Sequence, residues 1–202
     1  MRKIPRIPRG VARTAALALI VTGAGTAWAA SPPTATATVS EIQLSPTTYQ
    51  YSLTLNDALS SPSPIGTFWM AWVPGKDFLT TSPTSITSPA GWTATLPPTH
   101  GGSTDGYAIQ WIASSASSDD MAGGSLSGFT FISTDAPSSV FGNSSFYPSF
   151  ATLTSFAYDA APFSDAGTQF VPTVVVTPEP LSLGILAPAA LLLLRRRTAR
   201  KA

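Results

Sequence analysis

The middle of the chain holds one acidic doublet, Asp119-Asp120, in a segment rich in Ser and Gly. Carboxylate oxygens are ligands that Ca²⁺ prefers, and this cation takes six to eight of them. Asp57, Asp105, Asp135 or backbone carbonyls would have to complete such a site, and no D-x-D-x-D-G loop is present. The doublet is therefore a candidate calcium site, and the alternative is a solvated pair that keeps a loop soluble.

Catalytic side chains are scarce. The chain has no cysteine and one histidine, His100, which excludes a thiolate nucleophile, a disulfide framework and a multi-histidine metal site. His100, Asp105 and one of many serines would supply the residue types of a catalytic triad, but no G-x-S-x-G motif surrounds a serine. A glycosidase would need two carboxyl groups across a cleft, and no pair is singled out by its spacing. We expect no enzymatic activity, and a secreted hydrolase is the least favoured alternative.

Aromatic side chains offer a different chemistry, because an exposed indole ring can stack on a sugar. Trp69 and Trp72 are three residues apart, so on a straight strand they point to opposite faces. This spacing predicts that one ring lies in a core and that the other is exposed. The candidate glycan-binding residues are Trp69, Trp72, Trp92 and Trp111. The alternative is that all of them are core residues.

The elements that would position these side chains are predicted to be strands. Apolar residues recur with a period of two, as in Tyr49, Tyr51, Leu53 and Leu55, and no convincing 3.6-residue repeat appears. Segments rich in Pro, Gly, Ser and Asp separate the apolar segments. The pattern predicts eight strands, at residues 37–44, 49–55, 68–73, 92–96, 107–113, 128–132, 151–158 and 169–176. We therefore expect one all-β domain over residues 37–176, an antiparallel β-sandwich of the Ig-like or jelly-roll-like kind. Residues 30–36 are expected to form a flexible leader, and Pro172 moves the last strand towards an edge.

Basic residues gather at the two ends of the chain. Five lie within the first thirteen residues, five lie within residues 195–201, and only Lys76 lies between them. Residues 30–177 therefore carry nine acidic side chains against one basic one, a net charge of −8. Binding to phosphate polymers needs clustered Lys and Arg, so we expect no nucleic-acid partner.

The N-terminus has the order of a secretory signal peptide. Its basic residues precede an apolar stretch at 14–24, and Ala27-Trp28-Ala29 is a small-x-small site. This pattern predicts a signal helix over residues 1–29 that signal peptidase recognises at Ala27 and Ala29. An uncleaved anchor is the alternative.

The C-terminus has three parts in a fixed order. Pro178-Glu179-Pro180 comes first, an apolar run from Leu181 to Leu194 follows, and Arg195-Arg196-Arg197 comes last. Fourteen helical residues span about 21 Å, less than the roughly 30 Å of a hydrocarbon core. We therefore expect the run to form a short transmembrane helix, and the arginines Arg195 to Arg197 to act as a stop-transfer signal on the cytoplasmic side. A marginal span fits transient retention better than a lasting anchor.

This C-terminal arrangement resembles the PEP-CTERM sorting signal of Gram-negative bacteria. The resemblance rests on Val176 to Pro180, the Leu- and Ala-rich segment and the Arg triplet, and it covers residues 177–202. It implies that Pro178, Glu179 and Pro180 are recognised by an exosortase, an integral membrane protease, which cleaves near the motif. It says nothing about residues 37–176. A plain single-pass anchor is the alternative.

Together these features predict an exported protein that passes through the inner membrane to the cell surface, outer envelope or extracellular matrix. The expected partners are signal peptidase, an exosortase and, in transit, the inner membrane. The β domain is expected to be structural or adhesive. The alternative is a carbohydrate-binding module that recognises exopolysaccharide through exposed tryptophans. No cofactor is expected besides the candidate Ca²⁺.

Overall fold

The fold of this chain is all-β and mainly antiparallel. The computed structural model describes residues 31–97 and 106–176. Within them lie one 3₁₀ turn, η1 (Ala116–Ser118), and one short helix, α1 (Pro137–Val140). The strands are β1 (Ala35–Ser45), β2 (Thr48–Asp57), β3 (Thr67–Met70), β4 (Trp72–Val73), β5 (Lys76–Asp77), β6 (Ser85–Thr87), β7 (Trp92–Thr95), β8 (Ile109–Ala113), β9 (Ser125–Ser133), β10 (Ser155–Tyr158), β11 (Thr168–Phe170) and β12 (Thr173–Val174).

The first sheet has the strand order β12-β1-β2-β9-β6. Its centre is the long hairpin of β1 and β2, in which Ala37 is paired with Leu55 and Val39 with Leu53. Buried residues alternate with more exposed ones along both strands. This alternation is what a two-residue period produces when one face of a sheet is covered.

The second sheet has the strand order β11-β10-β3-β8-β7. β3 lies at its centre, and all four of its residues are buried, as expected for a strand that is covered on both faces. A separate two-stranded ribbon, β4 and β5, continues from β3.

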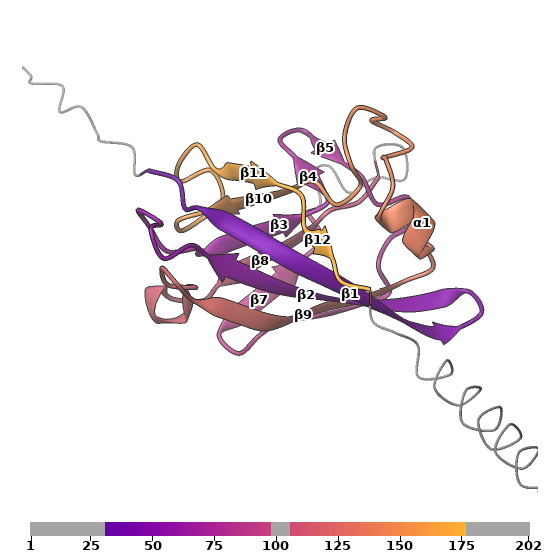
Figure 1. Cartoon of the computed structure of the whole chain (residues 1–202), viewed down its shortest axis with the longest axis horizontal. Coiled ribbons are helices and arrows are strands. Elements are labelled where there is room, and N and C mark those ends of the chain that lie inside the picture. Colours follow the sequence, from indigo (N-terminus) through magenta and orange to yellow (C-terminus); the bar gives the residue numbers. More distant parts are fainter. Residues whose placement is uncertain (1–30, 98–105, 177–202) are drawn as a thin grey trace, which may run out of the picture.

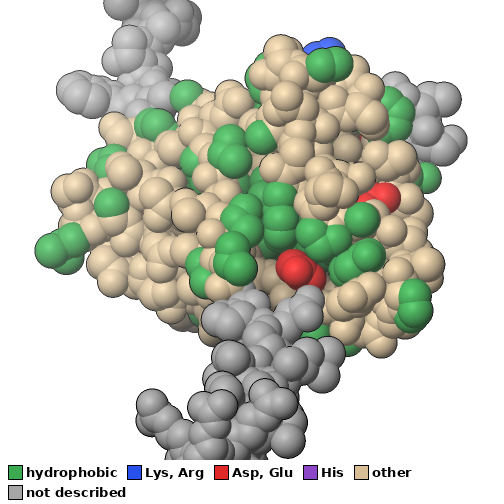
Figure 2. Space-filling model, turned by 45° about the vertical axis from the view of Figure 1, so that its right-hand side comes forward, with side chains coloured by type: hydrophobic (Ala, Val, Ile, Leu, Met, Phe, Trp, Pro, Cys, Tyr) green, Lys and Arg blue, Asp and Glu red, His purple; other side chains and the backbone are tan. Residues whose placement is uncertain are grey.

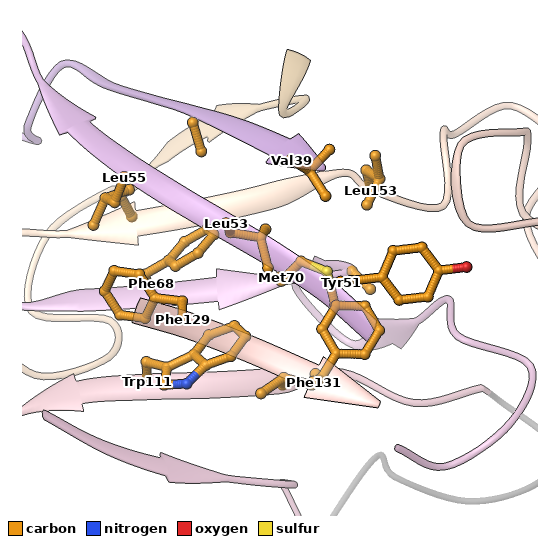
Figure 3. Packing of buried hydrophobic residues seen from close by; sticks show 14 of the residues in the cluster. Val39, Tyr51, Leu53, Leu55, Phe68, Met70, Trp111, Phe129, Phe131 and Leu153 are labelled. Carbon is orange, nitrogen blue, oxygen red and sulfur yellow. The ribbon is translucent and has the colours of Figure 1, made fainter. Parts of the chain in front are cut away.

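The two five-stranded sheets contribute side chains to one continuous apolar core (Figure 3). Phe68 of β3 meets Phe129 of β9 edge to face, with ring centroids 5.5 Å apart, and Trp111 of β8 lies 5.4 Å from the same ring. All three side chains are fully buried. Each such side chain stabilises the fold by about 1.5–3 kcal/mol relative to leaving it in water, so these rings hold the two sheets together.

The end of the described chain crosses from one sheet to the other. β11 pairs with β10 at the edge of the second sheet, and β12 pairs in parallel with β1 at the edge of the first (Figure 1). Val171 and Pro172 lie between them, and the Val175 amide donates to the Val39 carbonyl over 2.7 Å. Both strands are edge strands, as expected from Pro172, but the single strand predicted at 169–176 was wrong, because residues 171 and 172 separate two strands of different sheets.

Several predicted boundaries were wrong. β1 begins at Ala35, so the end of the expected leader 30–36 pairs with β2, and the Thr34 amide also donates to Ser61 Oγ. In segment 151–158 only Ser155–Tyr158 is a strand, because residues 151–154 form a turn and an isolated bridge. The short strands β5 and β6 carry no two-residue apolar period and were missed.

Candidate functional site

The tryptophans predicted to bind glycans are buried. Trp69 and Trp72 are 4% and 1% exposed, and their rings pack together with centroids 4.1 Å apart. The expectation that one of them faces solvent is wrong, because the strand is interrupted at Ala71, which has φ of +58°. This left-handed residue ends β3 and turns the chain, so both rings join one aromatic cluster with Phe156 and Tyr158.

The other two tryptophans belong to the main core. Trp92 is 6% exposed and Trp111 is fully buried. The indole N–H of Trp92 donates to the Ser118 carbonyl over 2.7 Å, and that of Trp111 donates to the Thr87 carbonyl over 2.9 Å. These two indoles satisfy their N–H group on a backbone carbonyl and use the ring for packing. None of the four rings offers an exposed face to a sugar.

The acidic doublet does not act as one unit, because its two side chains lie in different surroundings. Asp119 lines a small open pocket of about 200 Å³ together with Gly66, Ile112, Ala113, Ser115, Ala116, Ala160 and Ala161. Asp120 is 6% exposed and lies on the inner side of its loop. Its backbone forms two hydrogen bonds with Ile65, of 2.8 and 2.9 Å.

Asp120 lies close enough to Asp57, at the end of β2, for the charge of Asp57 to act on its carboxyl group. The Asp57 amide donates to the Gly124 carbonyl over 3.2 Å, and the Gly123 amide donates to the Asp57 carbonyl over 3.0 Å. These bonds fasten the end of β2 to the loop that carries Asp120. Gly124 is required there, because a Cβ at that position would lie 2.2 Å from Asp120 Oδ1.

The two carboxylates are buried, and few hydrogen bonds compensate for the loss of water around them. Asp57 is 3% exposed, and neither of its oxygens has a hydrogen-bond partner; Asp120 Oδ2 also has none. The donors beside Asp57 are engaged elsewhere, since the Ala58 amide donates to the Thr34 carbonyl and Ser61 Oγ to the Ser63 carbonyl. Unpaired buried charge is costly, so these two carboxylates are poorly satisfied in the folded chain.

The electrostatics follow from that burial. Desolvation, and then the charge of Asp57, raise the pKa of Asp120 to about 6. Desolvation also raises the pKa of Asp57, against the opposing influence of the nearby Ser61 hydroxyl and Ala58 amide. A carboxyl group whose ionisation is disfavoured by burial and by a neighbouring carboxylate is a common feature of functional sites.

A second acidic loop is better satisfied. The carboxylate of Asp165 accepts from the Asp159 and Gly167 amides, and the Ser164 hydroxyl donates to Asp159 Oδ1. These bonds shape the turn after β10. The pKa of Asp165 is raised, mainly by burial, but its carboxylate already has partners and does not call for a ligand.

The arrangement gives a limited chemical repertoire. In residues 31–97 and 106–176 no three His, Cys, Asp or Glu side chains are placed to hold a metal. The open pocket beside Asp119 has no second carboxylate in its lining, so it does not present the acid pair of a glycosidase. The Asp57–Asp120 pair is therefore the candidate site.

The sequence position of Asp57 carries a signal of its burial. In the two-residue period of β2, Asp57 falls on the same face as Tyr51, Leu53 and Leu55, which are all buried. A carboxylate at the next inward position of a strand is unusual, because Asp is rarely buried without a partner. No comparable signal marks Asp120.

The remaining predicted site residues lie outside the described residues. They are the signal-peptidase residues Ala27 and Ala29, the motif Pro178-Glu179-Pro180, the arginines 195–197, and His100 with Asp105. Among the residues that the structure does describe, no helix is long and apolar enough to cross a membrane.

Comparison with known proteins gives no family. No family model matches this chain, and no curated protein does either. A solved structure that matches in part is an inactive mutant of the GH20 exo-β-N-acetylglucosaminidase from Vibrio harveyi, at 10% identity and a TM-score of 0.37. The match covers 71% of this chain and 18% of that enzyme chain. A likeness this distant carries no argument about activity.

Proposed function

We propose that this protein is an exported cell-surface or matrix protein with a structural or adhesive β domain. In this proposal signal peptidase removes residues 1–29, and an exosortase recognises Pro178, Glu179 and Pro180 and cleaves near them. The observation that carries the proposal is the order of motif, apolar run and arginine triplet at residues 178–197.

The proposed architecture is a β-sandwich, Ig-like or jelly-roll-like. Two five-stranded sheets that share one core support it, because two sheets packed face to face are the usual way to cover the apolar side of each. Aromatic rings link the two sheets, with Phe68, Trp92 and Trp111 packed against Phe129.

The surface chemistry also fits a role outside the cytoplasm. The described residues include eight acidic side chains and one basic one, Lys76. Much of the visible surface belongs to uncharged polar side chains and backbone (Figure 2). Hydroxyl groups pair across strands, as between Thr87 and Thr130 at 2.6 Å. A surface of this kind is well solvated. Because it has no cluster of positive side chains among the described residues, it does not favour the binding of phosphate polymers.

A structural role is favoured over sugar recognition, because the four candidate tryptophans are buried. The position of the last strand supports processing at the motif. β12 is an edge strand, and Val176, which follows it, is 84% exposed. The motif begins two residues further on, at Pro178. Cleavage near the motif would therefore remove residues that follow the last strand and leave both sheets complete.

The proposal is tested by Glu179→Gln in the native host. We expect the variant to accumulate as an uncleaved precursor in the inner-membrane fraction, because the recognised carboxylate is lost. The matched control is Glu41→Gln, which changes the chain's other glutamate and should be delivered normally. Normal surface delivery of the Glu179 variant would overturn the recognition role.

A further inference from the structure

The Asp57–Asp120 pair lies where three segments meet at one end of the sheets. Asp57 ends β2, Asp120 lies in the loop before β9, and the third segment is the start of the described chain. That third segment is tied in by the Thr34 amide, which donates to Ser61 Oγ over 2.8 Å, and by Ser63 Oγ, which donates to the Ser31 carbonyl over 2.8 Å. The pair therefore lies at a junction that backbone bonds already hold in place.

No positive group among the described residues neutralises these carboxylates. Lys76 is the single basic side chain there, and its Nζ lies 4.3 Å from the centroid of the Tyr147 ring. Both Asp side chains are more than nine-tenths buried, and three of their four oxygens have no hydrogen-bond partner. Folding two charges into such a place is unfavourable unless something positive joins them.

The Ala58 amide lies beside Asp57, and four further groups around the pair can serve as oxygen ligands. They are the carboxylates of Asp57 and Asp120, the hydroxyl of Ser61 beside Asp57, and the carbonyl of Gly124, which accepts from the Asp57 amide. No nitrogen or sulfur ligand is present in this set. Hard cations prefer oxygen ligands, and Ca²⁺ tolerates irregular geometry and carbonyl ligands better than Mg²⁺ does.

We propose that Asp57 and Asp120 bind a divalent cation of the Ca²⁺ type, held jointly by the end of β2 and the loop before β9. The site differs from the Asp119-Asp120 doublet, because Asp119 points to the open pocket. Two carboxylates make a weak site, and extracellular modules of this kind bind Ca²⁺ with Kd of about 10⁻⁴–10⁻³ M. The bound cation fastens the two loops and stabilises the fold.

The test is thermal unfolding of the purified full chain after EDTA treatment and dialysis. Adding about 10 mM CaCl₂ should raise the melting temperature by about 5 °C, because the cation binds only the folded state. Calorimetric titration with CaCl₂ should give one site. NaCl at equal ionic strength should not reproduce the shift.

Three variants locate the site. Asp57→Asn and Asp120→Asn should each abolish the calcium shift, while their melting temperatures in EDTA are at least that of the unmodified protein, because a charge repulsion is removed. Asp119→Asn is the matched control and should keep the full shift. Since the titration of the unmodified protein does not depend on any variant, a variant that fails to fold leaves that measurement intact.

Two results would overturn the proposal. Absence of calcium binding by the unmodified protein, with a melting temperature that responds only to acidification, would show that the pair shares a proton instead. Loss of the calcium shift in Asp119→Asn would assign the ion to the doublet.

Discussion

The indole rings of Trp69 and Trp72 lie edge to face with their centroids 4.1 Å apart, although three residues of straight strand would have placed them on opposite faces of the sheet. The cause is Ala71, the second of the two residues between them. Ala71 is fully buried and has φ of +58°, a conformation that costs a non-glycine residue about 1–2 kcal/mol. Ala71 adopts this conformation all the same, and the two indole rings belong to one buried cluster.

The first prediction concerns this backbone position. Ala71→Gly should leave the free energy of unfolding within about 1 kcal/mol, because glycine adopts positive φ freely. Ala71→Val should lower it by roughly 2–4 kcal/mol, because a β-branched residue is poorly tolerated there and the site has no room. Urea denaturation of both variants measures the difference.

Ala94 in β7 is the control for that prediction, because it lies in a regular strand. There the order should be reversed, with Val tolerated better than Gly. If Val and Gly rank at position 71 as they do at position 94, the left-handed conformation of Ala71 is contradicted.

A second prediction tests the core shared by the two sheets. Phe129 contacts Phe68, Trp92 and Trp111 and is fully buried, so Phe129→Ala should lower the free energy of unfolding by about 3–5 kcal/mol. Phe163 is 59% exposed, and its ring contacts those of Trp69 and Tyr158 from the solvent side. Phe163→Ala should cost less than about 1 kcal/mol. Equal losses in guanidinium denaturation would argue against a core between the sheets.

The third prediction is a pH dependence of stability in EDTA. The pKa of Asp120 is raised to about 6 from 3.8, so between these values the folded protein holds a proton that the unfolded chain releases. The free energy of unfolding should therefore fall as pH rises from about 4 to 6.5, by roughly 1–3 kcal/mol, and level off above.

The raised pKa values of Asp57, Asp119 and Asp165 act in the same direction. Asp120→Asn should flatten the dependence between pH 5 and 7 in particular. A stability that increases with pH across this range in the unmodified protein would be incompatible with the buried pair.

Much of the fold was predictable, because period-two apolar patterns directly report strands with one covered face. Tyr51, Leu53 and Leu55 are buried as expected. The break at Ala71 was not predictable, since an alanine in the sequence gives no indication of a positive φ. The short strand β6 forms because β9 offers it an unpaired edge, and its own residues show no apolar period.

The candidate site was only partly predictable for a similar reason. Asp120 was singled out by its neighbour Asp119, but the carboxylate whose charge acts on it, Asp57, is more than sixty residues away in the chain. Which carboxylates meet depends on how the end of β2 reaches the loop before β9, and that is a property of sheet pairing. Composition and spacing along the chain do not predict which carboxylates come together.

The central claim is that both ends of the chain are removed and the β domain is delivered outside. Intact-mass analysis of the mature protein from its native host tests it most directly. The account predicts a mass that lacks residues 1–29 and the segment after the Pro178-Glu179-Pro180 motif. A mature protein that still carries Arg195 to Arg197 would contradict it and leave a membrane anchor in place of a sorting signal.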